Sequence, residues 1–216
     1  PQVLMIGEIR DLDTAETAAQ AALTGHILLS TLHTNSAIET VPRLLNVGLK
    51  PFMIAPALSI VMAQRLVRKV CSFCVVQKPI TESERKALQD AIDQIHEANP
   101  SMQLTVPPTL PVAAGCEKCS KTGFLGQVSI AEMFVNSDEL KEAILAEKST
   151  TELFRIVRSQ GMLTIGEDGV LKVLRGITTL NEVERVADIS IHRATARMQE
   201  EEKNWTITPA QSDTTA

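Results

Sequence analysis

Four cysteines, arranged as two C-x-x-C pairs, constrain the fold of this chain more than any other feature of its sequence. The pairs are Cys71/Cys74 and Cys116/Cys119, and the 216 residues contain no further cysteine. Four thiolates from two such pairs form the usual ligand set of a structural, tetrahedral Zn²⁺ site. Residues 75–115 must therefore loop out from the rest of the chain while the two pairs converge.

Two other uses of the cysteines are open, a pair of disulfides or a thioredoxin-like redox site. We favour zinc because a catalytic dithiol needs only one pair and because the thiols of a cytosolic protein stay reduced. Four thiolates around Zn²⁺ carry a net negative charge, and Lys69, Lys118 and Lys121 are near enough in sequence to offset it. The alternative for these lysines is a solvated surface position.

The distribution of charge argues against nucleic-acid binding. The chain has 21 Lys and Arg against 26 Asp and Glu, a net charge of −5, so no basic field attracts phosphate backbones. Residues 69–127 carry as many acidic as basic side chains, and their aromatics are Phe73 and Phe124 alone. We expect Phe124 to pack beside the cysteine pairs rather than to stack on bases.

No segment has the pattern of a membrane span or of a signal peptide. The longest apolar run, residues 51–63, is too short for a bilayer and contains Pro56 and Ser59. The chain starts at Pro1 with an apolar stretch typical of the inside of a strand. We therefore interpret it as a piece of a longer protein whose N-terminus is unknown.

The start of the chain has the pattern of a strand, a helix and a second strand. Residues 3–6 and 27–32 are continuous apolar runs, as expected of strands buried on both faces. Between them, Asp13-x-x-Glu16 has capping-box spacing before an Ala-rich helix, which Gly25 ends. Two strands joined by a crossover helix pair in parallel, and the chemistry of α/β sheets gathers at the carboxyl ends of such strands.

Glu8 and His33 follow the two predicted strands and are the candidate catalytic residues. Glu8 would hold a carboxylate at the sheet edge, where a metal ion or a water molecule can meet it. Each residue alone has a common structural explanation, a solvated carboxylate or a hydrogen-bonded histidine. Their shared position at the ends of one strand–helix–strand unit favours a functional role.

Two further helices are expected before the first cysteine. Residues 36–39 (S-x-x-E) can cap a helix that runs to Gly48. A third helix is expected over residues 51–68, because proline suits the first helical position. Pro56 lies inside this third pattern and should bend the helix.

Between the cysteine pairs we expect a helix followed by a loop. The capping box at residues 81–84 precedes an apolar face formed by Leu88, Ile92 and Ile95. Residues 99–115 hold four of the ten prolines of the chain, which predicts irregular structure.

After the second cysteine pair, residues 126–134 have the pattern of a strand that returns to the main sheet. Three capping boxes then precede apolar-periodic segments, and Gly161 and Gly176 are placed to end helices. The boxes are Ser149-x-x-Glu152, Thr164-x-x-Glu167 and Thr179-x-x-Glu182. We expect a small helical subdomain, followed after about Arg197 by a mobile tail.

Three strings near the start of the chain occur in the same order in one protein family. They are Met5-Ile6-Gly7-Glu8-Ile9-Arg10-Asp11, Ala21-Ala22-Leu23-Thr24-Gly25-His26 and Ser30-Thr31-Leu32-His33-Thr34-Asn35. With Gln64-Arg65-Leu66-Val67-Arg68 and the cysteine pairs, they closely resemble the ATPases of type II secretion and type IV pilus assembly, over residues 1 to about 188. The resemblance implies an α/β fold, the carboxyl-terminal part of a RecA-like P-loop ATPase core with an inserted tetracysteine zinc module and a small helical subdomain.

The same resemblance implies roles for the candidate residues. Residues 6–8 are similar to the Walker B element, in which Glu8 helps to position Mg²⁺ or orients the attacking water. Residues 25–33 are similar to the histidine box, with His33 near the γ-phosphate as a sensor or as a charge stabiliser. Arg10 and Arg65 would touch nucleotide or pair across subunits, and the alternative for both is a structural ion pair.

By this resemblance the chain divides into four parts. Residues 1–68 belong to the ATPase core, 69–127 to the zinc module, 128–188 to the returning strand and helical subdomain, and 189–216 to a helix end and tail. No G-x-x-x-x-G-K-[ST] phosphate loop is present in the 216 residues. We therefore expect half of a nucleotide site and an inactive fragment.

For the full-length protein the resemblance implies a cytoplasmic homo-hexamer, peripheral at the inner membrane, that hydrolyses ATP to drive assembly of a pseudopilus or pilus. Its cofactors would be structural Zn²⁺, and Mg²⁺ with ATP. Its partner would be an inner-membrane platform protein, with no nucleic acid. The tetracysteine module favours assembly or secretion over retraction, because by the resemblance retraction ATPases lack it. The alternative is a zinc-stabilised docking module that binds the platform protein without chemistry of its own.

Overall fold

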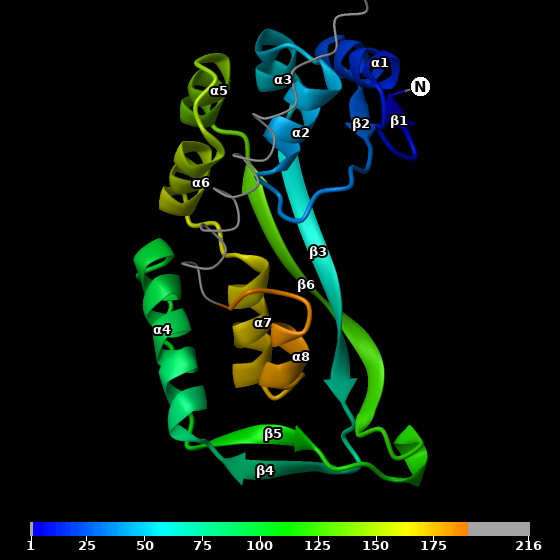
Figure 1. Ribbon diagram of the computed structural model, residues 1–216. Helices are drawn as coiled ribbons and strands as arrows, with labels where there is room; N and C mark the ends of the chain where they lie inside the picture. The colour runs from blue at the N-terminus through cyan, green and yellow to red at the C-terminus, as the bar shows by residue number, and fades with distance from the viewer. Residues whose placement is uncertain (1, 190–216) are drawn as a thin grey trace, which may run out of the picture.

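A long antiparallel ribbon of two strands is the central element of the molecule (Figure 1). The computed structural model describes residues 2–189. β3 (Ile60–Val70) pairs with β6 (Phe124–Val135), and the register shifts between Arg68 and Val70. Burial alternates along β3, so the ribbon turns one face toward the helices and the other outward.

This ribbon corrects two predictions. The strand expected at residues 126–134 is present, but it pairs with β3 and not with the first two strands. The helix expected over residues 51–68 ends early, because α3 spans Pro51–Ala57 and β3 follows it. Pro56 has no backbone N–H to donate, and the residues beyond it alternate between buried and exposed with the period of a strand.

The strand–helix–strand unit at the start of the chain is present as predicted. It consists of β1 (Val3–Met5), α1 (Leu12–Leu23) and β2 (Ile27–Leu29), and the two strands pair in parallel. The N-cap of α1 is Asp11, which accepts from the Thr14 N–H at 2.8 Å, and not Asp13. Gly25, with a φ of +89°, follows the end of the helix as expected.

One face of this small sheet is exposed and the other is only half-buried, so the prediction that both would be buried is wrong for the described chain. The side chains of Val3, Met5, Ile27 and Leu29 are between 54% and 77% exposed. Within residues 2–189 no third strand pairs with β1 or β2, and their side chains therefore have few neighbours.

The helix α2 (Thr40–Val47) begins later than the box at Ser36 predicts. Glu39, the expected fourth residue of that box, turns its carboxylate to the Asn35 N–H at 2.9 Å instead. Ser36 therefore stays in the loop between β2 and α2, which we call the histidine loop (residues 30–39). Gly48 ends α2 as predicted, with a φ of +111°.

The insert between the cysteine pairs has the predicted helix but also an unpredicted strand. α4 (Glu82–Ala98) starts with the capping box at Thr81, and its apolar face is buried, as expected. The loop expected over residues 99–115 is wrong in its last part, because β5 (Thr109–Ala113) pairs with β4 (Val75–Pro79). Both strands of a two-stranded sheet are edges, so the proline in β5 is tolerated.

The sheet of β4 and β5 closes the lower end of the molecule in Figure 1. Val75 pairs with Ala113, so the paired ends of the two strands adjoin the two cysteine pairs. A short 3₁₀ helix, η1 (Glu117–Cys119), carries the second pair. The insert can therefore loop out and still return both pairs to one place.

Within the described chain, four helices follow the ribbon and form the predicted helical subdomain. They are α5 (Asp138–Leu145), α6 (Thr150–Ser159), α7 (Ile165–Leu174) and α8 (Leu180–Glu184). Ser149, Thr164 and Thr179 are N-caps, as their boxes predict. Gly161 and Gly176 have positive φ at helix ends, also as predicted.

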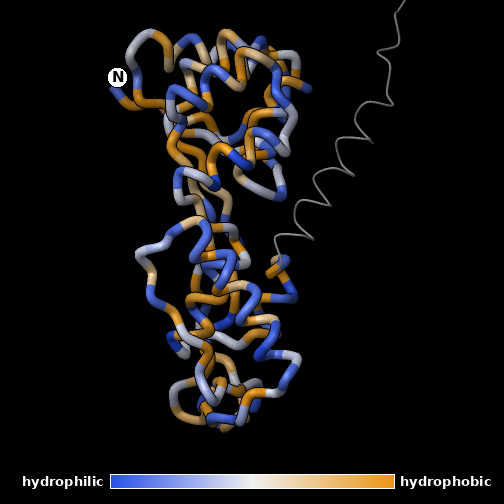
Figure 2. The backbone as a smooth tube through the Cα atoms, turned by 90° about the vertical axis from the view of Figure 1, so that its left-hand side faces the viewer, coloured by the Kyte–Doolittle hydropathy of each residue, from blue (hydrophilic) through white to orange (hydrophobic). Residues whose placement is uncertain are grey.

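One hydrophobic core runs through both the upper and the lower part of the molecule. Ile54, Ile130, Leu140 and Val157 are buried members of it from four different elements. Figure 2 shows apolar stretches of backbone in both parts. The tail expected after about residue 197 lies outside the described residues, and no helix of residues 2–189 has the length and hydropathy of a membrane span.

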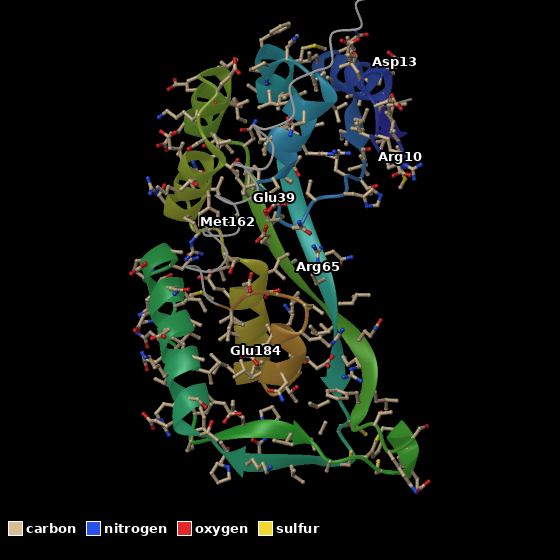
Figure 3. The ribbon with its side chains drawn as sticks, in the orientation of Figure 1. Arg10, Asp13, Glu39, Arg65, Met162 and Glu184 are labelled. Atoms are coloured by element: carbon tan, nitrogen blue, oxygen red, sulfur yellow. The ribbon has the colours of Figure 1, made fainter. Side chains whose placement is uncertain are left out.

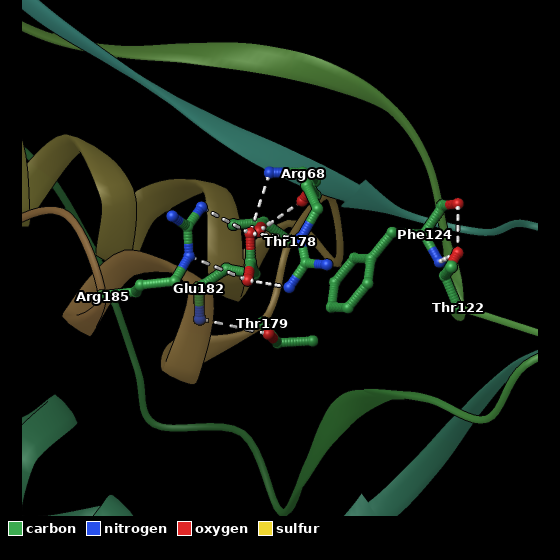
Figure 4. Close-up of polar contacts among 7 residues, drawn as sticks. All are labelled: Arg68, Thr122, Phe124, Thr178, Thr179, Glu182 and Arg185. Atoms are coloured by element: carbon green, nitrogen blue, oxygen red, sulfur yellow. Dashed lines mark hydrogen bonds and ion pairs between the residues drawn. The ribbon is translucent and has the colours of Figure 1, made fainter.

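Glu182 connects the end of β3 to the helical subdomain (Figure 4). Its side chain is buried, and its carboxylate accepts from Arg68 at Nε (3.0 Å) and Nη2 (2.5 Å) and from Arg185 at Nη2 (3.1 Å). The Arg68 guanidinium also lies 4.1 Å from the ring centroid of Phe124, the first residue of β6. The hydrogen bonds from Arg68 are the main cause that lowers the pKa of Glu182 to about 2.

We expect Glu182→Gln to lower the free energy of unfolding by about 2 kcal/mol at pH 7, after allowance for solvent screening at the half-exposed Arg68. A carboxyl group whose pKa is lowered from 4.5 to about 2 by folding stabilises the fold above pH 4.5 and loses that contribution as the pH falls toward 2. The difference between wild type and variant in chemical denaturation should therefore shrink between pH 5 and pH 2.

The exposed neighbour Glu184 provides the matched control, and Glu184→Gln should change the stability little. Equal stability of Glu182→Gln and wild type at pH 7 would contradict the assignment of Glu182 as an anchor of β3.

Candidate functional site

Glu8 and His33 meet just beyond the ends of the two parallel strands. Hydrogen bonds between the two segments continue past the strands, from the Ile9 N–H to the Thr31 carbonyl (3.0 Å) and from the Thr31 hydroxyl to the Gly7 carbonyl (2.6 Å). His33 Nε2 then lies 3.1 Å from Glu8 Oε2. The structure therefore brings together the two side chains that the sequence places at strand ends.

Arg10 joins this cluster at the other oxygen of the carboxylate, where its Nη2 lies 2.5 Å from Glu8 Oε1. This hydrogen bond is the main cause that lowers the pKa of Glu8 below its ordinary value of 4.5, and His33 adds to the effect. The side chains of His33 and Arg10 are 84% and 72% exposed, and that of Glu8 is 30% exposed. Glu8 is thus an ionised group between a guanidinium and an imidazole, and the cluster is open to solvent.

Arg65 lies on β3, away from Arg10 (Figure 3), and does not join the cluster. Its Nη2 donates to the Asn35 carbonyl at 3.2 Å, and its Nη1 donates to the Gln64 carbonyl at 2.9 Å. Asn35 is two residues beyond His33. Arg65 therefore holds the histidine loop and not the Glu8 carboxylate.

The four cysteines meet at the lower end of the ribbon, as their spacing requires. All four Sγ atoms lie within 4.8 Å of one another, with Cys71 4.0 Å from Cys116 and Cys74 3.8 Å from Cys119. These separations are about twice the length of a disulfide bond, and the four thiols are free. A compact, partly buried set of four sulfur ligands fits tetrahedral Zn²⁺.

Backbone N–H groups favour a thiolate at Cys119. The N–H groups of Cys116 and Gly123 each donate to its Sγ at 3.2 Å, and these bonds lower the pKa of Cys119 to about 6. Burial instead raises the pKa of Cys74 to about 12. Gly123 has a φ of +77°, and a Cβ there would lie 2.5 Å from that of Ala113, so the turn that aims its N–H at the sulfur requires glycine.

Sequence reasoning missed two buried carboxylates. Glu132 lies on the buried face of β6 between Ile130 and Phe134, and Glu167 is fully buried in α7, 2.6 Å from Arg158 Nη1. A single acidic residue at an inward position of an alternating strand was the available signal for Glu132. Glu167 was visible only as the last residue of a capping box.

The fold is of the RecA-like type found in two solved structures. The chain superposes with a TM-score of 0.55 and 21% sequence identity on the pilus retraction motor PilT with bound ADP, covering 87% of this chain and 40% of that one. The TM-score is 0.53, with 22% identity, for the ATPase DotB of Legionella pneumophila, covering 86% of this chain and 38% of that one.

Sequence comparison gives the family. The chain belongs to the Type II/IV secretion system protein family, whose profile matches residues 1–185. It is 46% identical over 185 residues to the type IV pilus assembly ATPase PilB of Thermus thermophilus, covering 85% of this chain and 20% of that protein. It is 42% identical over 186 residues to the type II secretion system protein E of Aeromonas hydrophila, covering 86% of this chain and 34% of that protein. The chain thus spans a fifth to a third of the length of these relatives.

We expect one Zn²⁺ per chain, held by Cys71, Cys74, Cys116 and Cys119 at about 2.3 Å. Metal analysis of protein purified without added zinc should give close to one equivalent. Cys71→Ser should reduce the zinc content and loosen the insert while β1 and β2 keep their pairing, because the sheet lies at the other end of the molecule.

Ser72→Ala, at an exposed position in the same turn, is the control and should keep its zinc. Rapid titration of all four thiols in native protein that holds no metal would contradict the zinc assignment.

Proposed function

We propose that this chain supplies the Walker B and histidine-box part of the ATP site in an ATPase that drives type II secretion or type IV pilus assembly. The observation that carries the proposal is the 3.1 Å contact between Glu8 and His33 at the ends of two parallel strands. Such strand ends are where open α/β sheets bind their ligands. Relatives with 42% to 46% identity are named as pilus assembly ATPase and as type II secretion protein E, which supports the assignment.

Each residue of the cluster has a separate task in this proposal. The Glu8 carboxylate, whose pKa Arg10 lowers, is charged at neutral pH and can meet Mg²⁺ or orient the attacking water. His33 is exposed and oriented by Glu8, which suits a donor to the γ-phosphate. Arg65 acts indirectly, because it binds the histidine loop that carries His33. Bound Mg²⁺ would supply charge neutralisation at the phosphates.

The phosphate-binding loop would come from the part of the protein that the relatives have beyond this chain. We therefore assign ATP hydrolysis, and assembly as a cytoplasmic homo-hexamer at the inner membrane, to the full-length protein. Its partner would be the inner-membrane platform protein, with no role for nucleic acid. Residues 1–68, 69–127 and 128–188 would serve as core, zinc module and helical subdomain, and the ribbon of β3 and β6 would join all three.

The tip of the zinc module favours a second, docking role. Phe73 is 60% exposed, and Lys118 Nζ lies 3.7 Å from its ring centroid. Lys121 is engaged with Glu117 at 3.4 Å. An exposed aromatic ring beneath a cation, on the turn that carries the cysteines, would suit contact with the platform protein.

In the full-length protein we expect Glu8→Gln to reduce Mg-ATP hydrolysis by roughly 100-fold or more while ATP still binds, because the change keeps the shape and removes the charge. His33→Ala should also slow hydrolysis. A steady-state ATPase assay and an ATP-binding titration measure the two effects.

Glu16→Gln, at an exposed position of α1, is the matched control and should leave the rate unchanged. A Glu8→Gln enzyme that turns over ATP at the wild-type rate would disprove the Walker B role.

The chain by itself should neither bind Mg-ATP tightly nor hydrolyse it, and it should be mostly monomeric. Phosphate recognition in this class of site depends on backbone amides and a lysine of a loop that these 216 residues lack. Calorimetric titration and light scattering test both statements. A micromolar affinity for ATP, or a stable hexamer, would contradict them.

A further inference from the structure

Glu132 joins the histidine loop to the helical subdomain. Its Oε1 accepts the Ala37 N–H, and its Oε2 accepts the Ile165 N–H at 3.2 Å. Ala37 lies in the histidine loop, four residues after His33, and Ile165 is the first residue of α7. One carboxylate, in a side chain that is 5% exposed overall, thus has backbone partners from two elements that are far apart in the sequence.

On one side of this contact, α7 is firmly fixed. Asp168 of α7 accepts the N–H of Ala131 on β6 at 2.8 Å. Glu167 of α7 accepts from Nη1 and Nη2 of Arg158 on α6, at 2.6 and 2.9 Å. Arg158 Nη2 also donates to the Gln94 carbonyl of α4 at 2.9 Å. The N-terminus of α7 is therefore a rigid reference point that β6, α6 and α4 hold in place.

On the other side, the histidine loop is irregular, with residues 30–35 exposed or half-buried and residues 36–39 buried. Asn35 is held at its carbonyl by Arg65 (3.2 Å) and at its N–H by Glu39 (2.9 Å). Asn35, Arg65, Glu132 and Ile165 line one small pocket, so the loop and the start of α7 face each other across it. The two hydrogen bonds of Glu132 hold the histidine loop and the start of α7 at a fixed separation.

We propose that Glu132 is a positioning residue for His33. Because its two oxygens each accept a different backbone N–H, the carboxylate fixes the histidine loop relative to α7. While α7 is docked on β6, Glu132 thus helps to keep His33 beside Glu8, in addition to the hydrogen bonds that Thr31 makes with Gly7 and Ile9. A movement of the helical subdomain would therefore change the contact between His33 and Glu8. This inference rests on the proposed function only where it predicts an effect on ATP hydrolysis.

Ile165→Pro tests the coupling, because it removes one hydrogen-bond donor and leaves Glu132 in place. Proline is favoured at the first position of a helix, and the preceding Thr164 is extended, with a ψ of 162°, which suits a residue before proline. Ile165→Val is the matched control, since it trims the side chain but keeps the N–H.

The measurement is made on the whole 216-residue chain by NMR, with the His33 ring signals and the exchange rate of the Ala37 amide as readouts. In Ile165→Pro we expect the His33 signals to shift and the Ala37 amide to exchange roughly tenfold faster, as local opening would produce. In Ile165→Val both should stay as in wild type. His33 signals that are the same in the two variants would overturn the proposal.

Glu132→Gln tests the carboxylate itself in the full-length protein, because a glutamine offers a single carbonyl oxygen and cannot accept both N–H groups. We expect kcat to fall roughly tenfold with little change in KM for ATP. In a His33→Ala background the same change should cause no further loss, since the effect acts through His33. Glu142→Gln, exposed on α5, is the matched control.

If the losses of kcat from Glu132→Gln and His33→Ala add in the double variant, the positioning role is overturned. If Glu132→Gln does not fold, the NMR comparison of the two Ile165 variants decides the question alone. If the full-length protein hydrolyses no ATP, the proposed function fails, and the NMR measurement still decides whether Glu132 positions His33.

Discussion

Burial of one face of the β3–β6 ribbon is the constraint on which the rest of the structure depends. Val67 and Ile130 are fully buried and Phe134 nearly so, and each such side chain contributes about 1.5 to 3 kcal/mol by leaving water. A two-stranded ribbon is not stable by itself. Helices that precede and follow it in the sequence must therefore cover the face, and α7 contacts both strands. This packing sets where the histidine loop, the zinc module and the helical subdomain lie.

Charged groups within this apolar setting make the specific connections. Glu132, Glu167 and Glu182 are buried, and each accepts hydrogen bonds from a neighbouring element. A buried carboxylate is tolerated only with such partners, so each one fixes a relative position of two elements. Glu8 differs, because it is partly exposed and has exposed partners. That contrast separates a carboxylate that can meet a ligand from those that hold the fold.

Local features of this fold could be predicted from the sequence. Hydroxyl side chains at Ser149 and Thr164 mark true helix starts, and the spacing of the cysteines required the convergence that the structure has. The strand β3 could not be predicted in the same way. Residues 60–70 mix helix-favouring Met, Ala, Gln, Leu, Arg and Lys with β-branched Val and Ile, so local preference does not decide between helix and strand, and the pairing with β6 does.

The prediction of the site was also limited by contacts that depend on the tertiary fold. Glu8 and His33 could be placed together because each follows a strand of one local unit. Arg65 could not be placed, because its contact with the histidine loop depends on β3 being a strand. The bridge at Glu132 depends on two elements that only the tertiary fold brings together. Candidate catalytic residues of one local unit can thus be found in the sequence, and the distant residues that position them cannot.

The central claim is that Glu8 and His33 form one half of an ATP site. A crystal structure of the full-length protein with Mg²⁺ and a non-hydrolysable ATP analogue tests it most directly. The account predicts that the Glu8 carboxylate meets the metal directly or through one water, and that the His33 ring lies about 3 Å from a γ-phosphate oxygen. A bound nucleotide whose γ-phosphate neither side chain can reach, even through one water, would contradict it.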